Sequence, residues 1–154
     1  MLLDETDIKI LKVLQRDARI TNQDLAERVG ISPSPCLRRV RKLEQDGVIE
    51  RYVTLVNPKA VGRAQQAFIE VRLEHQNRAL TERFEAEVQK LPEVLECYLV
   101  AGEWDYMLRV VVTDLDELRN FHMNKLGKVP GISNVKSNIC MKQAKFSTEL
   151  PLEL

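Results

Sequence analysis

Apolar side chains recur at helical spacing in three short segments of the first fifty residues. Each segment opens with a residue that favours helix N-caps, Asp4, Thr21 or Ser32. Apolar residues lie one position before and four positions after each of them. Gly30 and Gly47 stand where the second and third segments should end, as glycines that follow helix C-termini do. The pattern predicts three helices, the last two joined by the tight turn of a helix-turn-helix.

The predicted third helix separates charged from apolar side chains. At about 100° per residue, Cys36, Leu37, Val40 and Leu43 fall within one arc, which we expect to face the core. The opposite side is cationic, and residues 32–43 contain no acidic side chain. A charged face of this kind also suits water, but the two-helix spacing favours contact with DNA bases and phosphates. The predicted DNA-contacting residues are Ser32, Ser34, Pro35, Arg38, Arg39, Arg41 and Lys42.

After Gly47 the pattern changes from helical to β-rich. Residues 48–58 end at Asn57-Pro58 and predict a strand-like linker. Beyond the linker the chain predicts strand, helix, strand, strand, helix and strand, at about 65–74, 78–91, 94–100, 106–113, 115–127 and 135–145. This is the βαββαβ order of ferredoxin-like domains. We therefore predict an α+β chain with a helix-turn-helix domain over 1–49, a linker over 50–63 and a βαββαβ domain over 64–154.

The two middle strands of the predicted sheet carry apolar side chains on both faces. Tyr98 and Val100 face away from one apolar row, and Met107 and Val111 face away from the next. Helices cover one face of such a sheet, so we expect a second subunit to cover the other. The pattern predicts an obligate homodimer, which suits a helix-turn-helix protein that reads two half-sites.

The turn between these strands, residues 101–106, combines one glycine with one aspartate. A hairpin turn in which Gly102 supplies a positive φ is the simple interpretation. The same turn would offer backbone N–H groups to a carboxylate, while Asp105 would pair with an ammonium group. Together these groups would hold the two charged ends of a free α-amino acid.

Composition narrows the class of protein further. The chain has 154 residues, 44% of them apolar, which suffices for one or two folded domains. Its 23 basic and 23 acidic residues give zero net charge, so attraction to phosphate must be local. No signal peptide or membrane span is apparent, and Cys36, Cys97 and Cys140 lack metal-ligand spacing. We expect a reduced, cytoplasmic protein with no cofactor and no membrane association.

An enzyme is not expected from this sequence. His75 and His122 are the only histidines, and they fall in different predicted elements. The chain also lacks a nucleophile elbow, a phosphate-binding loop and a metal-binding motif.

Several motifs, in order along nearly the whole chain, make it similar to the Lrp/AsnC family of bacterial and archaeal regulators, and especially to its leucine-responsive branch. They are Leu-Asp-x-x-Asp-x-x-Ile-Leu from Leu3, Ser-Pro-Ser-Pro-Cys-Leu-Arg-Arg-Val at 32–40, Leu43-Glu44-x-x-Gly47-Val48-Ile49, Gly102-x-x-Asp105-Tyr106 and Pro130-Gly131-Ile132. Glu103 and Trp104 occupy positions at which the turn varies within the family, and the large Trp104 bears on both pocket size and ligand choice.

The resemblance implies a winged helix-turn-helix joined to an effector-binding and oligomerisation domain. It further implies dimers that assemble into tetramers or octamers, with a small amino acid bound at the contact between dimers. Carried over by position, it assigns the effector site to Gly102, Asp105 and Tyr106, and more loosely to Leu99 and Ser137.

We therefore expect a sequence-specific, DNA-binding transcriptional regulator, associated with the nucleoid, that responds to leucine, methionine or a similar free amino acid. An architectural protein that wraps double-stranded DNA without any effector is the alternative. Stabilisation of the folded protein by a ligand distinguishes the two.

Overall fold

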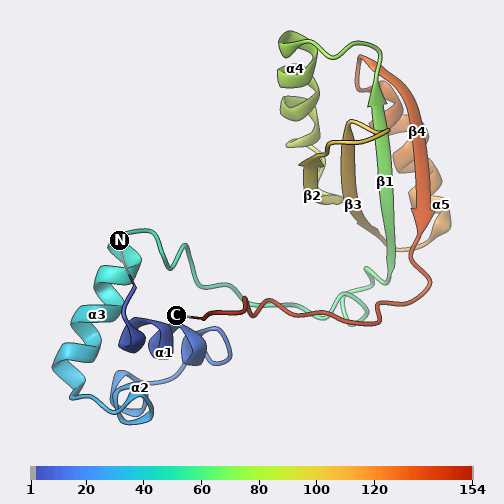
Figure 1. Cartoon of the computed structure of the whole chain (residues 1–154). Helices are drawn as coiled ribbons and strands as arrows, with labels where there is room; N and C mark the ends of the chain where they lie inside the picture. Colours follow the sequence, from blue (N-terminus) through green and yellow to red (C-terminus); the bar gives the residue numbers. More distant parts are fainter. Residues whose placement is uncertain (1–2, 154) are drawn as a thin grey trace. The chain divides into compact units, whose positions relative to one another are not determined.

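The computed structural model describes residues 3–153 and divides the chain into two compact units. One unit joins the N-terminal part, up to Leu55, with the C-terminal segment from Ala144 onward; the other is Val56–Gln143. The predicted α+β architecture is confirmed (Figure 1). The division differs from the predicted boundaries because the C-terminal segment belongs with the N-terminal helices.

The three predicted helices of the first unit are present as α1 (Glu5–Leu14), α2 (Asn22–Val29) and α3 (Pro33–Gln45). Asp4 caps α1 through a reciprocal pair of hydrogen bonds with Asp7, at 2.8 and 3.2 Å. Thr21 caps α2 by accepting from the Asp24 backbone N–H. Gly30 ends α2 with a φ of 75°, which a residue without Cβ adopts at least cost.

One prediction about the core of this unit is wrong. Cys36 and Leu43 of α3 are fully buried, but Leu37 is 39% exposed on the outward side of the helix. It lies at the edge of the predicted arc, where the neighbouring helices do not cover it. The rest of the buried core comes from α1 and α2: Ile10, Leu11, Leu25, Ala26 and Val29.

The C-terminal segment packs against α1 and the residues that follow it (Figure 1). The Gln15 side chain donates to the Leu150 carbonyl at 3.1 Å and accepts from its N–H at 2.6 Å. Arg16 pairs with Glu149 at 2.8 Å, and Leu152 packs on the helical core. These polar and apolar contacts hold the end of the chain on the helix-turn-helix unit.

The predicted strand-like linker is not a strand in this structure: residues 46–64 contain none. An extended segment becomes a strand only when a neighbour takes up its backbone N–H and C=O groups, and no segment within residues 3–153 does so. Several apolar side chains of the linker are exposed as a result: Tyr52, Val53, Leu55, Val56 and Val61.

The second unit is a four-stranded antiparallel sheet in the order β2-β3-β1-β4. Its elements are β1 (Gln65–Leu73), α4 (Arg78–Val88), β2 (Val94–Leu99), β3 (Tyr106–Val112), α5 (Leu115–Asn120) and β4 (Ile132–Ile139). This confirms the predicted βαββαβ order. Side chains of α4 and α5, including Phe84 and Leu118, share one buried core with alternate residues of the strands. Both helices therefore cover the same face of the sheet.

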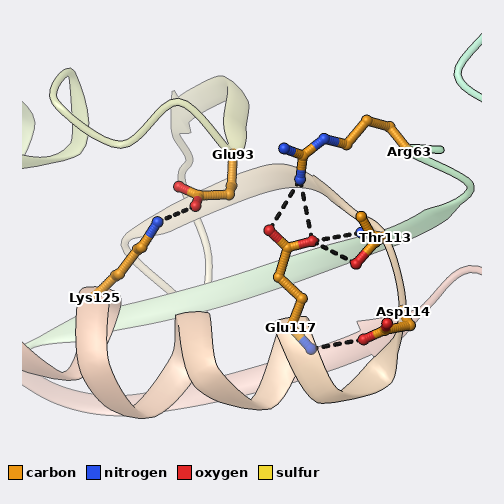
Figure 2. Close-up of polar contacts among 6 residues, drawn as sticks. All are labelled: Arg63, Glu93, Thr113, Asp114, Glu117 and Lys125. Carbon is orange, nitrogen blue, oxygen red and sulfur yellow. Dashed lines mark hydrogen bonds and ion pairs between the residues drawn. The ribbon is translucent and has the colours of Figure 1, made fainter. Parts of the chain in front are cut away.

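The second helix and the last strand are shorter than predicted. After α5 the chain forms a π-helical turn, Phe121–Lys125, and a 3₁₀ turn, Leu126–Lys128. Gly127 permits this change, because a Cβ there would lie 2.9 Å from the His122 carbonyl oxygen. The π turn also carries Lys125, which pairs with the buried carboxylate of Glu93 (Figure 2).

Glu117 of α5 fixes the point where the linker enters the sheet (Figure 2). Its carboxylate accepts from the Thr113 N–H at 2.6 Å, the Thr113 hydroxyl at 2.8 Å and the Arg63 guanidinium at 2.9 Å. These donors, Thr113 first, lower the pKa of Glu117 from 4.5 to about 2. Arg63 lies two residues before β1, so this cluster anchors the end of the linker.

A group whose pKa is lowered in the folded state contributes stability above its unfolded pKa, and this contribution is lost as the pH falls through the folded value. We therefore expect the free energy of unfolding of the wild type to decline between about pH 4.5 and pH 2 more steeply than that of Glu117→Gln. Urea unfolding at a series of pH values measures the difference. Arg63→Gln is expected to keep most of the wild-type slope, because Thr113 supplies the main donors. Equal slopes for the wild type and Glu117→Gln would contradict this assignment.

Candidate DNA-binding helix and effector cavity

The outward side of α3 forms a shallow hollow of about 530 Å³. It collects three of the predicted cations together with Ser34 and the unexpectedly exposed Leu37. Arg38, Arg41 and Lys42 form no ion pair with any residue that the structure describes. Their charges are therefore available for phosphates and base edges, and Leu37 adds an apolar surface of the kind that contacts a thymine methyl group.

Arg39 has a different environment from the other cations of α3. Its guanidinium pairs with Asp4 at 2.7 Å and with Asp7 at 2.8 Å, the two carboxylates of the α1 cap. The Asp7 side chain is only 11% exposed. Although the sequence assigned Arg39 to DNA, this ion pair gives it a role in fixing α3 against α1.

The remaining predicted DNA contacts lie at the start of α3. Ser32 is the exposed N-cap residue, and its side chain makes no capping hydrogen bond. Pro35 is half-buried in the first turn. The Pro33 carbonyl accepts from the Asn22 side chain at 2.8 Å, which ties α3 to the start of α2. This bond fixes the turn of the helix-turn-helix motif.

Four of the five predicted effector residues gather around one cavity of about 670 Å³ in the second unit. Leu99, Gly102, Asp105 and Tyr106 line it on the β2–β3 side. The β1–α4 connection and the first turn of α4 line the other side through residues that sequence reasoning missed: Gln76, Asn77, Arg78 and Thr81. The pairing of antiparallel β1 and β3 was the available signal, since it brings the end of β1 beside the start of β3.

Asp105 is 8% exposed, and both of its carboxylate oxygens have hydrogen-bond donors. Oδ2 accepts from the Leu73 backbone N–H, and Oδ1 accepts from Nε2 of Gln76, each at 2.7 Å. The Asp105 N–H in turn donates to the Val71 carbonyl at 3.0 Å. Asp105 therefore fastens the β2–β3 turn to β1 and presents a buried negative charge at the cavity.

The turn itself offers unused backbone donors. In the described part of the chain, the N–H groups of residues 101–104 have no hydrogen-bond acceptor. Arg72 holds the turn from outside, donating to the Glu103 carbonyl at 2.7 Å and lying 5.0 Å from the centre of the Trp104 ring. Trp104 is thus packed against Arg72 and is not among the residues that line the cavity.

Tyr106 forms an inner wall of the cavity and is 1% exposed. Its hydroxyl donates to the Glu85 carboxylate at 2.6 Å, and its ring lies 4.5 Å from that of Phe84. Burial, with the neighbouring Glu85 carboxylate, raises the pKa of Tyr106. The hydroxyl is therefore neutral, and its hydrogen bond is taken up by Glu85.

Ser137 does not belong to this cavity. It lies on β4 beside a separate hollow of about 350 Å³, where its hydroxyl is 3.4 Å from Nδ1 of His122. The walls of this second hollow are almost entirely apolar, and Leu115, Met123 and Ile139 are all about half exposed or more. A single chain therefore does not bring Ser137 together with the other four residues.

The fold and these two surfaces define a helix-turn-helix DNA-binding protein with a separate ligand-binding domain. Among residues 3–153, no helix is long and apolar enough to cross a membrane, and no cluster of metal-ligating side chains occurs. Residues 3–50 match the family described as winged helix-turn-helix DNA-binding, and residues 66–150 match the family described as Lrp/AsnC ligand binding domain.

Individual relatives agree with these matches. The chain is 40% identical to the leucine-responsive regulatory protein of Salmonella typhimurium over 98% of its own length and 92% of that protein. It is similar to a transcriptional regulator from Neisseria meningitidis solved in complex with L-methionine, with a TM-score of 0.93, 43% identity and 97% of each chain covered. The structure of AsnC from E. coli matches at a TM-score of 0.89 and 27% identity, over 98% of this chain and 100% of that one. The chain belongs to the Lrp/AsnC family of DNA-binding transcriptional regulators and is not an enzyme.

Proposed function

We propose that this regulator senses a free apolar α-amino acid, leucine or methionine first, in the cavity beside Asp105. The observation that carries the proposal is the buried Asp105 carboxylate at a cavity that is also lined by Ala101 and Gly102, whose backbone N–H groups have no acceptor in the described part of the chain. A carboxylate and a set of backbone donors suit the ammonium and carboxylate ends of an amino acid. Leu73, Leu99 and the Tyr106 ring supply an apolar wall for its side chain. The similar regulator from Neisseria meningitidis, solved in complex with L-methionine, supports this choice of ligand.

A second subunit completes the site in this proposal. The cavity is open to solvent, and Ser137 lies beside a different hollow of the same chain. The apolar patch around Ser137 would supply the missing wall from a neighbouring dimer, which gives a tetramer or octamer. Within each dimer, the helix-free face of the sheet supports the pairing, because Phe68, Tyr98 and Met107 are exposed there.

A ligand held between dimers would act by changing the equilibrium between assemblies, since it binds one arrangement more tightly than another. The DNA-binding surfaces of α3 would then be presented at a different spacing. Sequence-specific repression or activation would follow from that spacing.

A thermal-shift screen of the purified protein against all twenty amino acids at millimolar concentration tests the proposal. We expect a selective rise in the unfolding midpoint with leucine, methionine or a similar side chain, because a ligand that binds only the folded state stabilises it. A protein that no amino acid stabilises would favour the second candidate, an architectural DNA-wrapping protein. The cations that line the hollow of α3 support that candidate equally well.

A further inference from the structure

The two hydrogen bonds that hold the Asp105 carboxylate differ in how easily they are replaced. The donor to Oδ2 is the backbone N–H of Leu73, the last residue of β1, which is fixed by the sheet. The donor to Oδ1 is the side-chain amide of Gln76, an exposed residue in the connection between β1 and α4. Gln76 lies at the rim of the cavity and contributes to its lining.

The ammonium group of an amino acid competes for the position of the Gln76 amide. A hydrogen bond between two charged groups is about twice as strong as one from a neutral amide. An ammonium group has three donors, and it neutralises a carboxylate that is only 8% exposed. Gln76 can turn into solvent at little cost, whereas the Leu73 N–H cannot leave without breaking the end of the sheet.

We propose that the Gln76 side-chain amide takes the place of the effector's ammonium group in the ligand-free protein. It donates to Asp105 Oδ1 there and is displaced when an α-amino acid binds. This inference rests on the proposed function. It makes Gln76 a specificity residue: a ligand without an amino group cannot replace the hydrogen bond to Asp105 Oδ1 and so does not displace Gln76.

The N-cap of α4 limits how Gln76 can move. The next residue, Asn77, is the N-cap of that helix, and its side chain accepts from the Leu80 N–H at 2.9 Å. Movement of the Gln76 backbone is therefore limited by the cap, and the side chain alone must swing away. The cavity then opens without unwinding α4.

Replacing Gln76 with methionine, which has a similar length and no donor, tests the proposal. We expect the Kd for L-methionine, measured by calorimetry on the full-length protein, to fall about three- to tenfold, because the ligand no longer competes with an internal hydrogen bond. His75→Ala is the matched control, since His75 lies in the same connection but does not line the cavity. Its Kd is expected to equal that of the wild type. L-Leucine serves as a second probe.

The des-amino analogue 4-(methylthio)butanoate separates displacement from a general loosening of the loop. Gln76→Met should tighten binding of L-methionine and leave the weak binding of the analogue unchanged. A Kd for L-methionine that is unchanged or higher in Gln76→Met overturns the assignment while the proposed function stands. A wild-type protein that binds no amino acid overturns both.

Discussion

Asp105→Asn is expected to remove the amino-acid response while leaving DNA binding intact. Asparagine keeps an oxygen for the Leu73 N–H, so the turn stays fastened to β1. It loses the negative charge, and truncating one partner of a buried, hydrogen-bonded charge pair costs about 2–5 kcal/mol of binding. The Kd for the effector should therefore rise at least about thirtyfold. A gel-shift titration with and without amino acid measures the loss.

Asp105→Ala should also remove the response, but it should lower the stability of the second unit as well. It leaves the buried Leu73 N–H without its acceptor, which destabilises the second unit by about 1–3 kcal/mol. DNA affinity should be preserved in both variants, because α3 belongs to the other unit. A normal amino-acid response in Asp105→Asn would exclude Asp105 as the ammonium site.

Arg38→Ala is expected to lose DNA affinity and Arg39→Ala to lose stability, although the two residues are adjacent. Arg38 lines the outward hollow of α3 and forms no ion pair in the described chain, so its loss should weaken specific DNA binding by about 1–3 kcal/mol without changing stability. Arg39 pairs with Asp4 and Asp7, so its loss should lower the free energy of unfolding of the first unit by about 1 kcal/mol.

Fluorescence anisotropy with operator and random DNA, together with thermal unfolding of each variant, separates these effects. Equal loss of affinity for operator and random DNA in Arg38→Ala would make Arg38 a phosphate contact and not a base contact. A stable Arg39→Ala protein with reduced DNA affinity would return Arg39 to the DNA surface that the sequence assigned to it.

Local patterns predicted most of the fold because the deciding interactions are local. The caps at Asp4 and Thr21, the glycine after α2 and the alternation in β1 each depend on residues a few positions apart. Leu37 was misplaced because helical periodicity gives a direction but not the extent of the neighbouring helices. The π turn after α5 was missed for a similar reason. The need for a glycine at position 127 is evident only from the close approach of the His122 carbonyl, which the sequence does not reveal.

The candidate sites were predicted less completely than the fold. Glycine and aspartate marked the effector turn, but the partners of Asp105 come from β1 and Gln76, about thirty positions earlier in the chain. No periodicity connects such residues. The same limit applies to Arg39. In the sequence it is an arginine of the predicted third helix like Arg38, and only the position of α1 in the structure shows that it pairs with Asp4 and Asp7.

The attachment of the C-terminal segment to α1 has a consequence for the order in which the molecule forms. Because residues from Ala144 onward pack with the N-terminal helices, the ligand-binding unit is an insertion within the DNA-binding unit. During synthesis the three helices emerge first, yet their contacts with Leu150 and Leu152 wait until the whole intervening domain has left the ribosome. The DNA-binding unit is therefore the last part of the molecule to be completed. A chain whose synthesis stops within the ligand-binding unit lacks the C-terminal contacts that support the DNA-binding helices.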